Sequence, residues 1–413
     1  MNHFTPLALA ASLTFLANLG YGQSVIVVDD QMGPGVHFTS LTAALNSALD
    51  GDVVLVKPGD YYGDVHPLGG LRDYRIDGKS IDLVGDTGGP IRLRDSFFSV
   101  QNLGPTQHVS VTGIEFTDAS FAALNCQGSV VVSRCRFPAF GSFSSSPSPK
   151  RMLIISGTET FVLENSWIEG RQTSNAFGTA PGDAIDAEGS NLFLYNSTVL
   201  GGKGNVGKQG GRGLRLTNSS LFASGGMILG GQAGDKSSFS GICSTPGAGI
   251  TILPGSVVET VNVRVGGGQT GNFCTIPTEG CAPAIEGALT ALTITQEVPH
   301  HITATSPVRE GGVMTIGATG QNHEFVFLAL SAKTDPFFQL ALSAMSFVDL
   351  ASYSITTLGS ITSSAEELYA FPVPLMPIGI DATVLTAQLL FADTMGKASV
   401  SGMARVVLLD SKY

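Results

Sequence analysis

The sequence predicts an all-β fold in which a parallel β-helix solenoid is followed by a small antiparallel β-sandwich domain. The first observation is an internal repeat: AIDAEGSNLFLYNSTVLGG at 184–202 aligns without gaps with GLRLTNSSLFASGGMILGG at 213–231. Further copies fit the same frame and begin at Ala122, Leu153 and Gly249, with a last partial copy at Ala284. Repeats of about 30 residues in a Gly-rich chain are typical of solenoids.

The second observation is that the apolar residues of each unit alternate with a period of two. The alignment stacks Ile185 on Leu214 and Ile250, and it assigns Ile154 and Ser156 to the same inward columns. Alternation over four or five residues, bounded by Gly, Asn and Ser, indicates short strands separated by turns. Such coils close only if each strand bonds to its counterpart one coil away, about 4.8 Å distant, so the units predict a parallel β-helix.

The N-terminal segment SVIVVDDQMGPGVHFTSLTAALNSALDGDVVLVKPGDYYGDV at 24–65 combines a strand, a helical stretch and a GD-strand-PG-Y motif. Ser40 precedes apolar residues at helical spacing, and Gly51 with Asp52 ends that stretch. These parts resemble the start of a right-handed parallel β-helix of the pectin-lyase-like superfamily, as found in secreted bacterial proteins. The resemblance covers roughly residues 24–300 and implies an N-terminal capping helix. It implies no single function, because this superfold includes lyases, hydrolases, adhesins and inert scaffolds.

The chain divides into three parts. Residues 1–22 predict a signal peptide, with an apolar stretch from Leu7 to Leu19, so we expect a secreted or cell-surface protein with no membrane span after cleavage. Residues 23–299 form the predicted β-helix with its N-terminal cap. Residues 300–413 alternate apolar and small polar residues in many short runs, which predicts a C-terminal β-sandwich-like module. This module could cap the open end of the solenoid or attach it to something else.

The composition bears on which classes of molecule the protein can bind. The net charge is −11, charged residues make up 13% of the chain, and no Lys or Arg precedes Lys57, which argues against nucleic acid. The five cysteines are consistent with disulfide bonds that link loops in an oxidising compartment, and the sequence does not decide how they pair. They are Cys126, Cys135, Cys243, Cys274 and Cys281. A bridge between Cys126 and Cys135 across one coil is one option. No Cys/His spacing predicts a metal site.

One outward column could carry chemistry. The alignment places in it Leu124, Ile155, Asp186, Arg215, Thr251 and Glu286. Asp183 and Glu188 flank Asp186, so Asp183, Asp186, Glu188 and Arg215 are the candidate catalytic residues. A hydrolase would use two or three carboxylates there, and a lyase a base near a calcium-binding acidic pair, which makes calcium the one cofactor considered. The structural alternative is a surface ion pair between Asp186 and Arg215, one coil apart.

The Gly clusters at 201–213, 230–234 and 266–271 recur at one point of the repeat, so we attribute them to turns in which glycine adopts positive φ rather than to a nucleotide site. Within the first cluster, Lys203, Lys208 and Arg212 form a candidate basic loop for an anionic glycan.

Two register details test the alignment. Asn165 and Asn196 fall at equivalent turns and predict a ladder of amides. Arg264 aligns with inward apolar residues, so we expect that coil to slip by one residue and keep Arg264 outside.

Two functions remain. The first is a non-enzymatic, secreted or cell-surface scaffold that presents loops to a polysaccharide or another cell-surface component. The second is a carbohydrate-active enzyme, a polysaccharide lyase or glycoside hydrolase, that acts from the outward face of one parallel sheet. The absence of a His, Lys or paired-acid cluster on adjacent coils favours the scaffold. A cleft that combines those carboxylates with aromatics such as Trp167, the one Trp of the chain, would favour the enzyme.

Overall fold

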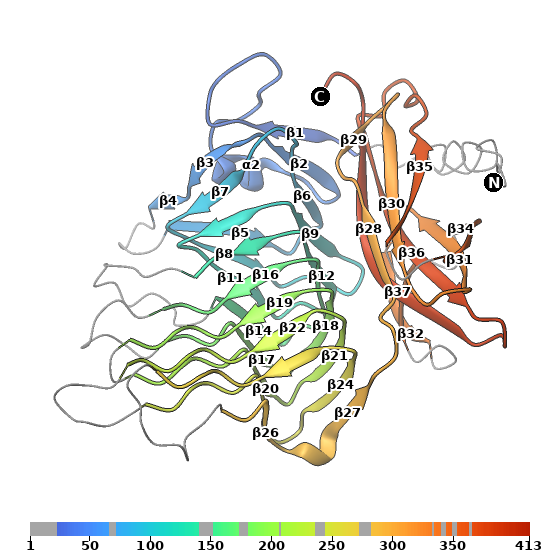
Figure 1. Cartoon of the computed structure of the whole chain (residues 1–413). Coiled ribbons are helices and arrows are strands. Elements are labelled where there is room, and N and C mark those ends of the chain that lie inside the picture. The colour runs from blue at the N-terminus through green and yellow to red at the C-terminus, as the bar shows by residue number, and fades with distance from the viewer. Residues whose placement is uncertain are drawn as a thin grey trace.

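The computed structural model describes residues 23–65, 72–139, 152–172, 181–205, 208–235, 244–271, 282–332, 334–339, 344–348, 353–362 and 366–413. The predicted signal peptide at 1–22 lies outside these residues. Within them the chain forms a parallel β-helix with an antiparallel β module beside it (Figure 1). No helix in the described part of the chain is long and apolar enough to cross a membrane.

The solenoid consists of three long sheets, and within them every described pair of neighbouring strands is parallel except β4 and β5. The ten-stranded sheet contains, in spatial order, β1 (Val25–Val28), β2 (Asp52–Val56), β6 (Ile81–Gly85), β9 (His108–Thr112), β12 (Ser129–Ser133), β15 (Thr160–Glu164), β18 (Asn191–Tyr195), β21 (Ser220–Ser224), β24 (Val257–Val261) and β27 (Leu292–Thr295). The nine-stranded sheet contains β4 (Asp64–Val65), β5 (Arg72–Asp77), β8 (Ser96–Gln101), β11 (Ser120–Leu124), β14 (Leu153–Ser156), β17 (Ile185–Glu188), β20 (Leu214–Thr217), β23 (Ile250–Ile252) and β26 (Ile285–Gly287). The eight-stranded sheet contains β3 (Gly59–Tyr62), β7 (Ile91–Arg94), β10 (Glu115–Thr117), β13 (Arg136–Phe137), β16 (Trp167–Glu169), β19 (Thr198–Leu200), β22 (Met227–Leu229) and β25 (Arg264–Gly266).

The predicted capping helix is confirmed. Helix α2 (Leu41–Ser47) begins after Ser40, whose side chain accepts a hydrogen bond from the Ala43 backbone nitrogen at 3.3 Å. Leu41, Ala44 and Leu45 are buried in the same core cluster as the strands of the first coils. The helix therefore covers apolar residues that the first coil would otherwise expose.

The predicted stacking of coils is also confirmed. Ile185 pairs with Leu214, Leu214 with Ile250, and Ile250 with Ile285, and the first three of these are fully buried. Further up the stack phenylalanine rings fill the interior, with the centroids of Phe98 and Phe121 5.3 Å apart. The solenoid is thus a packed core and not a channel.

The gap-free alignment is wrong by one residue in the strand β14. The outward column also contains Ala122 in place of Leu124, a shift of two residues in β11. In β14, Leu153 and Ile155 face the core, whereas Ile154 and Ser156 face outward, so Ile154 takes the place of Ile155. The cause is one additional residue, Glu159, in the turn that follows β14. Thr158 is the counterpart of Ser190 there, because its backbone nitrogen donates to the Ser190 hydroxyl at 3.0 Å.

The other two register predictions hold. Val265 pairs with Ile228 and Arg264 is exposed, so the coil slips by one residue as expected. Asn165 and Asn196 have φ of 46° and 45°. The Asn196 amide donates to the Asn165 side-chain oxygen at 2.9 Å, which is the predicted ladder.

The explanation of the Gly clusters by positive φ is wrong. No described glycine of the three clusters has positive φ. Backbone hydrogen bonds of 2.7–3.1 Å instead link the loops where they leave or rejoin successive coils, through Gly182, Gly202, Gly211, Gly231, Gly247 and Gly268. We call these six residues the glycine layer. A Cβ atom on Gly231 would lie 2.1 Å from the Gly202 carbonyl oxygen, so close packing of backbone on backbone, not turn geometry, requires glycine there.

The C-terminal module forms three antiparallel sheets, apart from one parallel pair. The first contains β28 (His301–Ala304), β30 (Val313–Thr319) and β35 (Glu367–Pro372). The second contains β29 (Val308–Arg309), β37 (Ala398–Leu409), β36 (Ala382–Ala392), β31 (Phe325–Ser331) and β34 (Tyr353–Ser360), in which β29 and β37 are parallel. The third contains β32 (Thr334–Gln339) and β33 (Ala344–Val348). A short 3-10 helix, η1 (Leu289–Ala291), precedes β27 near the solenoid end.

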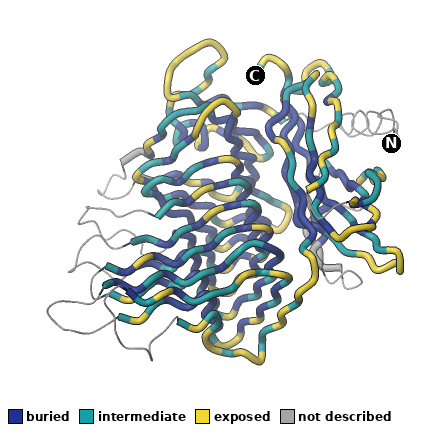
Figure 2. Tube along the Cα trace, in the orientation of Figure 1, coloured by how far each residue is buried: buried dark blue, intermediate teal, exposed yellow. Residues whose placement is uncertain are grey.

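The module lies along the side of the ten-stranded sheet and does not cap the open end of the solenoid (Figure 1). Val384, Val407 and Leu409 pack on residues of β1, β2 and β6, and Phe347 and Met403 pack on residues of β12, β15 and β18. These contacts bury most outward residues of the sheet from β1 to β15, whereas outward residues of β24 and β27 are exposed or half-buried; Figure 2 colours the first of these stretches mainly as buried. Of the two roles considered for the module, capping the open end is therefore wrong: the module packs on the apolar outward residues of the first coils.

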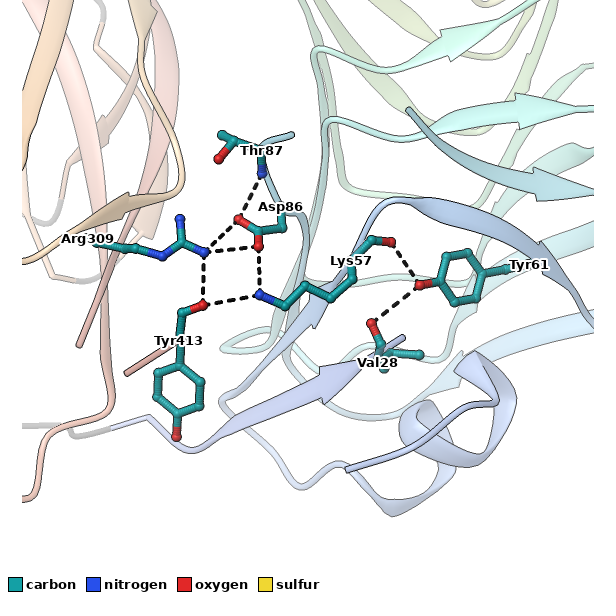
Figure 3. A network of polar contacts seen from close by, with 7 residues as sticks. All are labelled: Val28, Lys57, Tyr61, Asp86, Thr87, Arg309 and Tyr413. Atoms are coloured by element: carbon teal, nitrogen blue, oxygen red, sulfur yellow. Dashed lines mark hydrogen bonds and ion pairs between the residues drawn. The ribbon is translucent and has the colours of Figure 1, made fainter. Parts of the chain in front are cut away.

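Two buried acids anchor the module. Arg405 donates to both carboxylate oxygens of Asp82, at 2.8 and 2.9 Å. Burial raises the pKa of Asp82, but Arg405, together with His108 at 3.8 Å and the hydrogen bond from Ser110, outweighs burial and lowers it below the usual range. Near the top of the stack, Asp86 accepts from Lys57 at 2.8 Å and from Arg309 at 3.0 Å (Figure 3).

A third buried acid at this interface, Glu164, forms no ion pair with any residue that the structure describes. Glu164, at the end of β15, is 2% exposed and accepts a hydrogen bond from the Ser133 hydroxyl at 3.2 Å. Burial raises the pKa of Glu164 to about 8, against the smaller opposing effects of Ser133 and Arg134. Arg134 itself donates to the backbone oxygens of Ala304 and Ser306 in the module.

Gly231→Ala tests the glycine layer. The methyl group would overlap the Gly202 carbonyl, and overpacking of this kind destabilises by about 1–3 kcal/mol. We expect a lower thermal midpoint by circular dichroism. Gly33→Ala is the control, because its nearest contact would be an ordinary 3.9 Å. Equal midpoints for the two variants would contradict backbone-on-backbone packing.

Glu164→Gln tests the buried acid. The folded protein keeps a proton on Glu164 up to pH near 8, whereas the unfolded chain releases it near the ordinary value of 4.5. Unfolding is therefore favoured progressively as the pH rises from about 5 to 8, and the glutamine variant lacks this loss. We expect the difference in unfolding free energy between variant and parent to grow over that range. Glu159→Gln, exposed on the same coil, should show no such growth; a difference independent of pH would refute the raised pKa.

Candidate functional site

The predicted site lies on the outer face of the nine-stranded sheet, beside the glycine layer. Its column, read from strand pairing, contains Ala122, Ile154, Asp186, Arg215, Thr251 and Glu286. Side chains at one outward position of successive parallel strands are about 4.8 Å apart. The structure therefore brings Asp186 and Arg215 together on adjacent coils, as predicted.

Arg212 connects the two ends of this patch. Its backbone nitrogen donates to Asp183 Oδ1 at 2.8 Å, and its guanidinium lies 3.7 Å from Asp183 Oδ2. The same guanidinium lies 4.0 Å from Glu286 Oε2. Glu286 also accepts from the Thr251 hydroxyl at 3.1 Å. Arg212, predicted as part of the basic loop, thus belongs to the acidic patch.

The other three predicted catalytic residues differ in burial. Asp186 is 8% exposed, and Arg215, its partner in register, is half-buried. Glu188 is exposed at the end of β17, between Ser156 and Thr217 in register. Asp186 and Glu188 share one side of the strand because they are two residues apart.

This arrangement limits the chemistry. A glycosidase needs two carboxyl groups about 5–9.5 Å apart, one of them held as an acid in an apolar site or beside another carboxylate. The Cα atoms of residues two apart on a strand are separated by about 6.6 Å, so the backbone spacing of Asp186 and Glu188 is compatible with such a pair. Arg212 lies against both Asp183 and Glu286, and Arg215 lies in register with Asp186. A cation therefore lies beside each of Asp183, Asp186 and Glu286, whereas Glu188 lies between Ser156 and Thr217 in register.

The three residues of the predicted basic loop do not form one cluster in the part of the chain that the structure describes. Lys203 is exposed and Lys208 is half-buried. The Lys208 backbone oxygen accepts from Gly234 at 2.9 Å, which ties this loop to the next one. Among the described residues, no hydrogen bond or ion pair joins either lysine side chain to Arg212 or to the acidic patch.

Neither metal nor disulfide expectations find support in the described residues. No group of three or more His, Cys, Asp or Glu there is arranged to hold a metal ion, so the acidic patch does not fit the calcium considered for a lyase. Cys126 and Cys135 are buried free thiols, so the bridge proposed between them is wrong. They lie at different corners of the coil, with Cys126 Sγ against the Val100 backbone oxygen and Cys135 Sγ against that of Val111. Cys243, Cys274 and Cys281 lie outside the described residues.

A second polar column was missed. The outward positions of the eight-stranded sheet contain Asp60, Arg92, Glu115, Arg136, Trp167, Thr198, Met227 and Arg264. The signal was present in the third short strand of each repeat, where charged residues recur just before a buried apolar one. Trp167 lies in this sheet and the acidic patch in another, so these residues do not form the aromatic cleft that would favour an enzyme.

No protein-family model matches the sequence, and no curated protein matches it significantly. Two solved structures are similar in fold. The enzymatically active domain of tailspike protein 2 from bacteriophage CBA120 is 9% identical, with 97% of this chain and 74% of that chain covered and a TM-score of 0.27. A pectin methylesterase from Aspergillus niger is 10% identical, with 67% of this chain and 81% of that chain covered and a TM-score of 0.23. Similarity at these TM-scores says nothing about activity, so the function has to be argued from the residues themselves.

Proposed function

We propose that the protein is a secreted or cell-surface β-helix scaffold that binds a polysaccharide or another cell-surface component and has no enzymatic activity. The observation that carries this proposal is the alternation of charge in the patch on the nine-stranded sheet. Arg212 contacts both Asp183 and Glu286, and Arg215 lies beside Asp186 in register. Such a surface offers fixed hydrogen-bond donors and acceptors to a ligand, and three of its four acids have a cation beside them.

The rigidity of the scaffold supports a binding role. Asp186, Glu188 and Arg215 extend from β17 and β20, each of which is bonded to a strand on both sides, and the loops beside the patch are packed through the glycine layer. A ligand that binds there meets groups already in place and orders few of them, which favours affinity. Lys203 and Arg212, both with exposed cationic groups, favour a ligand that carries some negative charge.

The alternative is a carbohydrate-active enzyme. One observation favours it: the backbone spacing of Asp186 and Glu188 is compatible with a glycosidase pair. A lyase is less favoured, because the described acids of the patch do not form a calcium site.

Incubation with a panel of uronate-containing and neutral polysaccharides, with and without calcium, separates the two functions. We expect binding in affinity electrophoresis without release of reducing or unsaturated ends. Arg212→Gln should weaken binding by about tenfold or more, because a charge-assisted hydrogen bond contributes about 1.5–3 kcal/mol. The control is Glu259→Gln, which changes a half-buried acid on the ten-stranded sheet. Release of new chain ends that disappears in Asp186→Ala would establish the enzyme instead.

A further inference from the structure

The eight-stranded sheet carries a surface that the proposed function does not use. Its outward column runs through Arg136, Trp167, Thr198, Met227 and Arg264, one residue per coil. Four coil steps separate the two arginines, which corresponds to about 19 Å at about 4.8 Å per coil. We call this stretch, with Leu200 and Leu229 in the neighbouring outward column, the tryptophan strip.

The charges above the strip are neutralised. Asp60 accepts from Arg94 Nε at 2.7 Å and lies 3.7 Å from Arg92. Arg92 in turn lies 4.0 Å from Glu115 Oε1. Acids and bases thus alternate down to Glu115, which is the column neighbour of Arg136.

The two arginines of the strip differ from those above it. Arg136 and Arg264 are both exposed, and neither makes a hydrogen bond or ion pair with any residue in the described part of the chain. Glu169, the acid nearest to Trp167 in sequence, is already an acceptor for the Ala139 backbone nitrogen at 3.2 Å and the Gln172 amide at 3.5 Å. The strip therefore has a guanidinium with unused donors at each end.

Between the arginines the surface is largely apolar. Trp167 is 40% exposed, and Thr198, Leu200, Met227 and Leu229 are half-buried. An exposed indole presents a flat face on which a sugar ring can stack, and its N–H remains able to donate a hydrogen bond. The Thr198 hydroxyl adds a polar group on the next coil.

We propose that the tryptophan strip binds an extended anionic polysaccharide, with one sugar ring on Trp167 and anionic groups at Arg136 and Arg264. Arginine matches the geometry of carboxylate and sulfate groups through paired N–H donors. The separation of the two arginines requires a ligand with repeated anions along its length. This inference concerns a different sheet from the acidic patch and does not depend on binding there.

Other occupants fit the surface less well. A peptide could add a strand only beside β25, the edge strand, and not along the strip, because the other strands of the strip already have a neighbour on both sides. Nucleic acid requires clustered cations, and the strip has two on a chain of net charge −11. A second copy of the chain is the remaining occupant, and the experiment below distinguishes it.

Trp167 is the single tryptophan, so emission excited at the red edge of the absorption band, where the eight tyrosines absorb little, reports on this site alone. The probes are dextran sulfate and carboxymethyl-dextran, with unmodified dextran as the neutral polymer of the same backbone. We expect the anionic polymers to shift Trp emission in a saturable and salt-sensitive way, and dextran to cause little change. In the Arg136→Gln, Arg264→Gln double variant the Kd should rise at least about tenfold, because both charge-assisted contacts to the anionic groups are lost.

Two matched variants make the result specific. Arg92→Gln alters an arginine of the same column that already faces Asp60 and Glu115, and the Kd should change less than about twofold. Arg212→Gln, on the nine-stranded sheet, should leave the Trp titration unchanged even if binding to the acidic patch is lost. Trp167→Phe should keep the fold by circular dichroism and weaken binding in affinity electrophoresis.

Three outcomes would overturn the proposal. The first is an emission shift of the same size with dextran, and the second is an unchanged Kd in the double arginine variant. The third is an emission that changes with protein concentration alone, together with a doubled mass in sedimentation, because the occupant would then be a second copy of the chain.

Discussion

Each coil of the solenoid depends on its neighbours for its backbone hydrogen bonds, and the rest of the structure follows from this dependence. The turns obey it as well as the strands: the Asn165 nitrogen donates to the Tyr195 oxygen one coil on, and the Gly157 nitrogen to that of Glu188. Because successive coils are held in register, side chains at one position form columns. The acidic patch and the tryptophan strip are two such columns, on two different sheets.

Much of this architecture could be predicted from the repeat. The columns from Ile185 to Ile285 and from Asp186 to Glu286 follow directly from equal spacing within each unit. The error at β14 has a clear origin: Leu153, Ile154 and Ile155 are all apolar, so the alternation fits either register. Only contacts one coil away reveal that Glu159 is additional. The glycine layer was misread for a similar reason, since a sequence shows that glycine is needed but not whether φ or space requires it.

The candidate site was predictable to the same degree. Spacing places Asp183, Asp186, Glu188 and Arg215 around one face, but it cannot show that the Arg212 side chain reaches Glu286. The position of the C-terminal module was beyond prediction, because it depends on Asp82 and Arg405, which are far apart in the chain and lie in unremarkable local patterns. Once paired and buried, these two charges cannot be separated without leaving one uncompensated, which typically costs about 3–5 kcal/mol.

The strand β37 runs lengthwise across the ten-stranded sheet, with Val407 and Leu409 against the first coils, Arg405 on β6 and Met403 near β12, β15 and β18. The spacing of these contacts along β37 therefore fixes the number of coils between β6 and β12. Insertion or deletion of a whole coil between β6 and β12 would shift one set of contacts by one coil and place those side chains opposite the wrong strand. Coils beyond β21 have no such constraint, so variation in the length of this solenoid should be concentrated toward its far end.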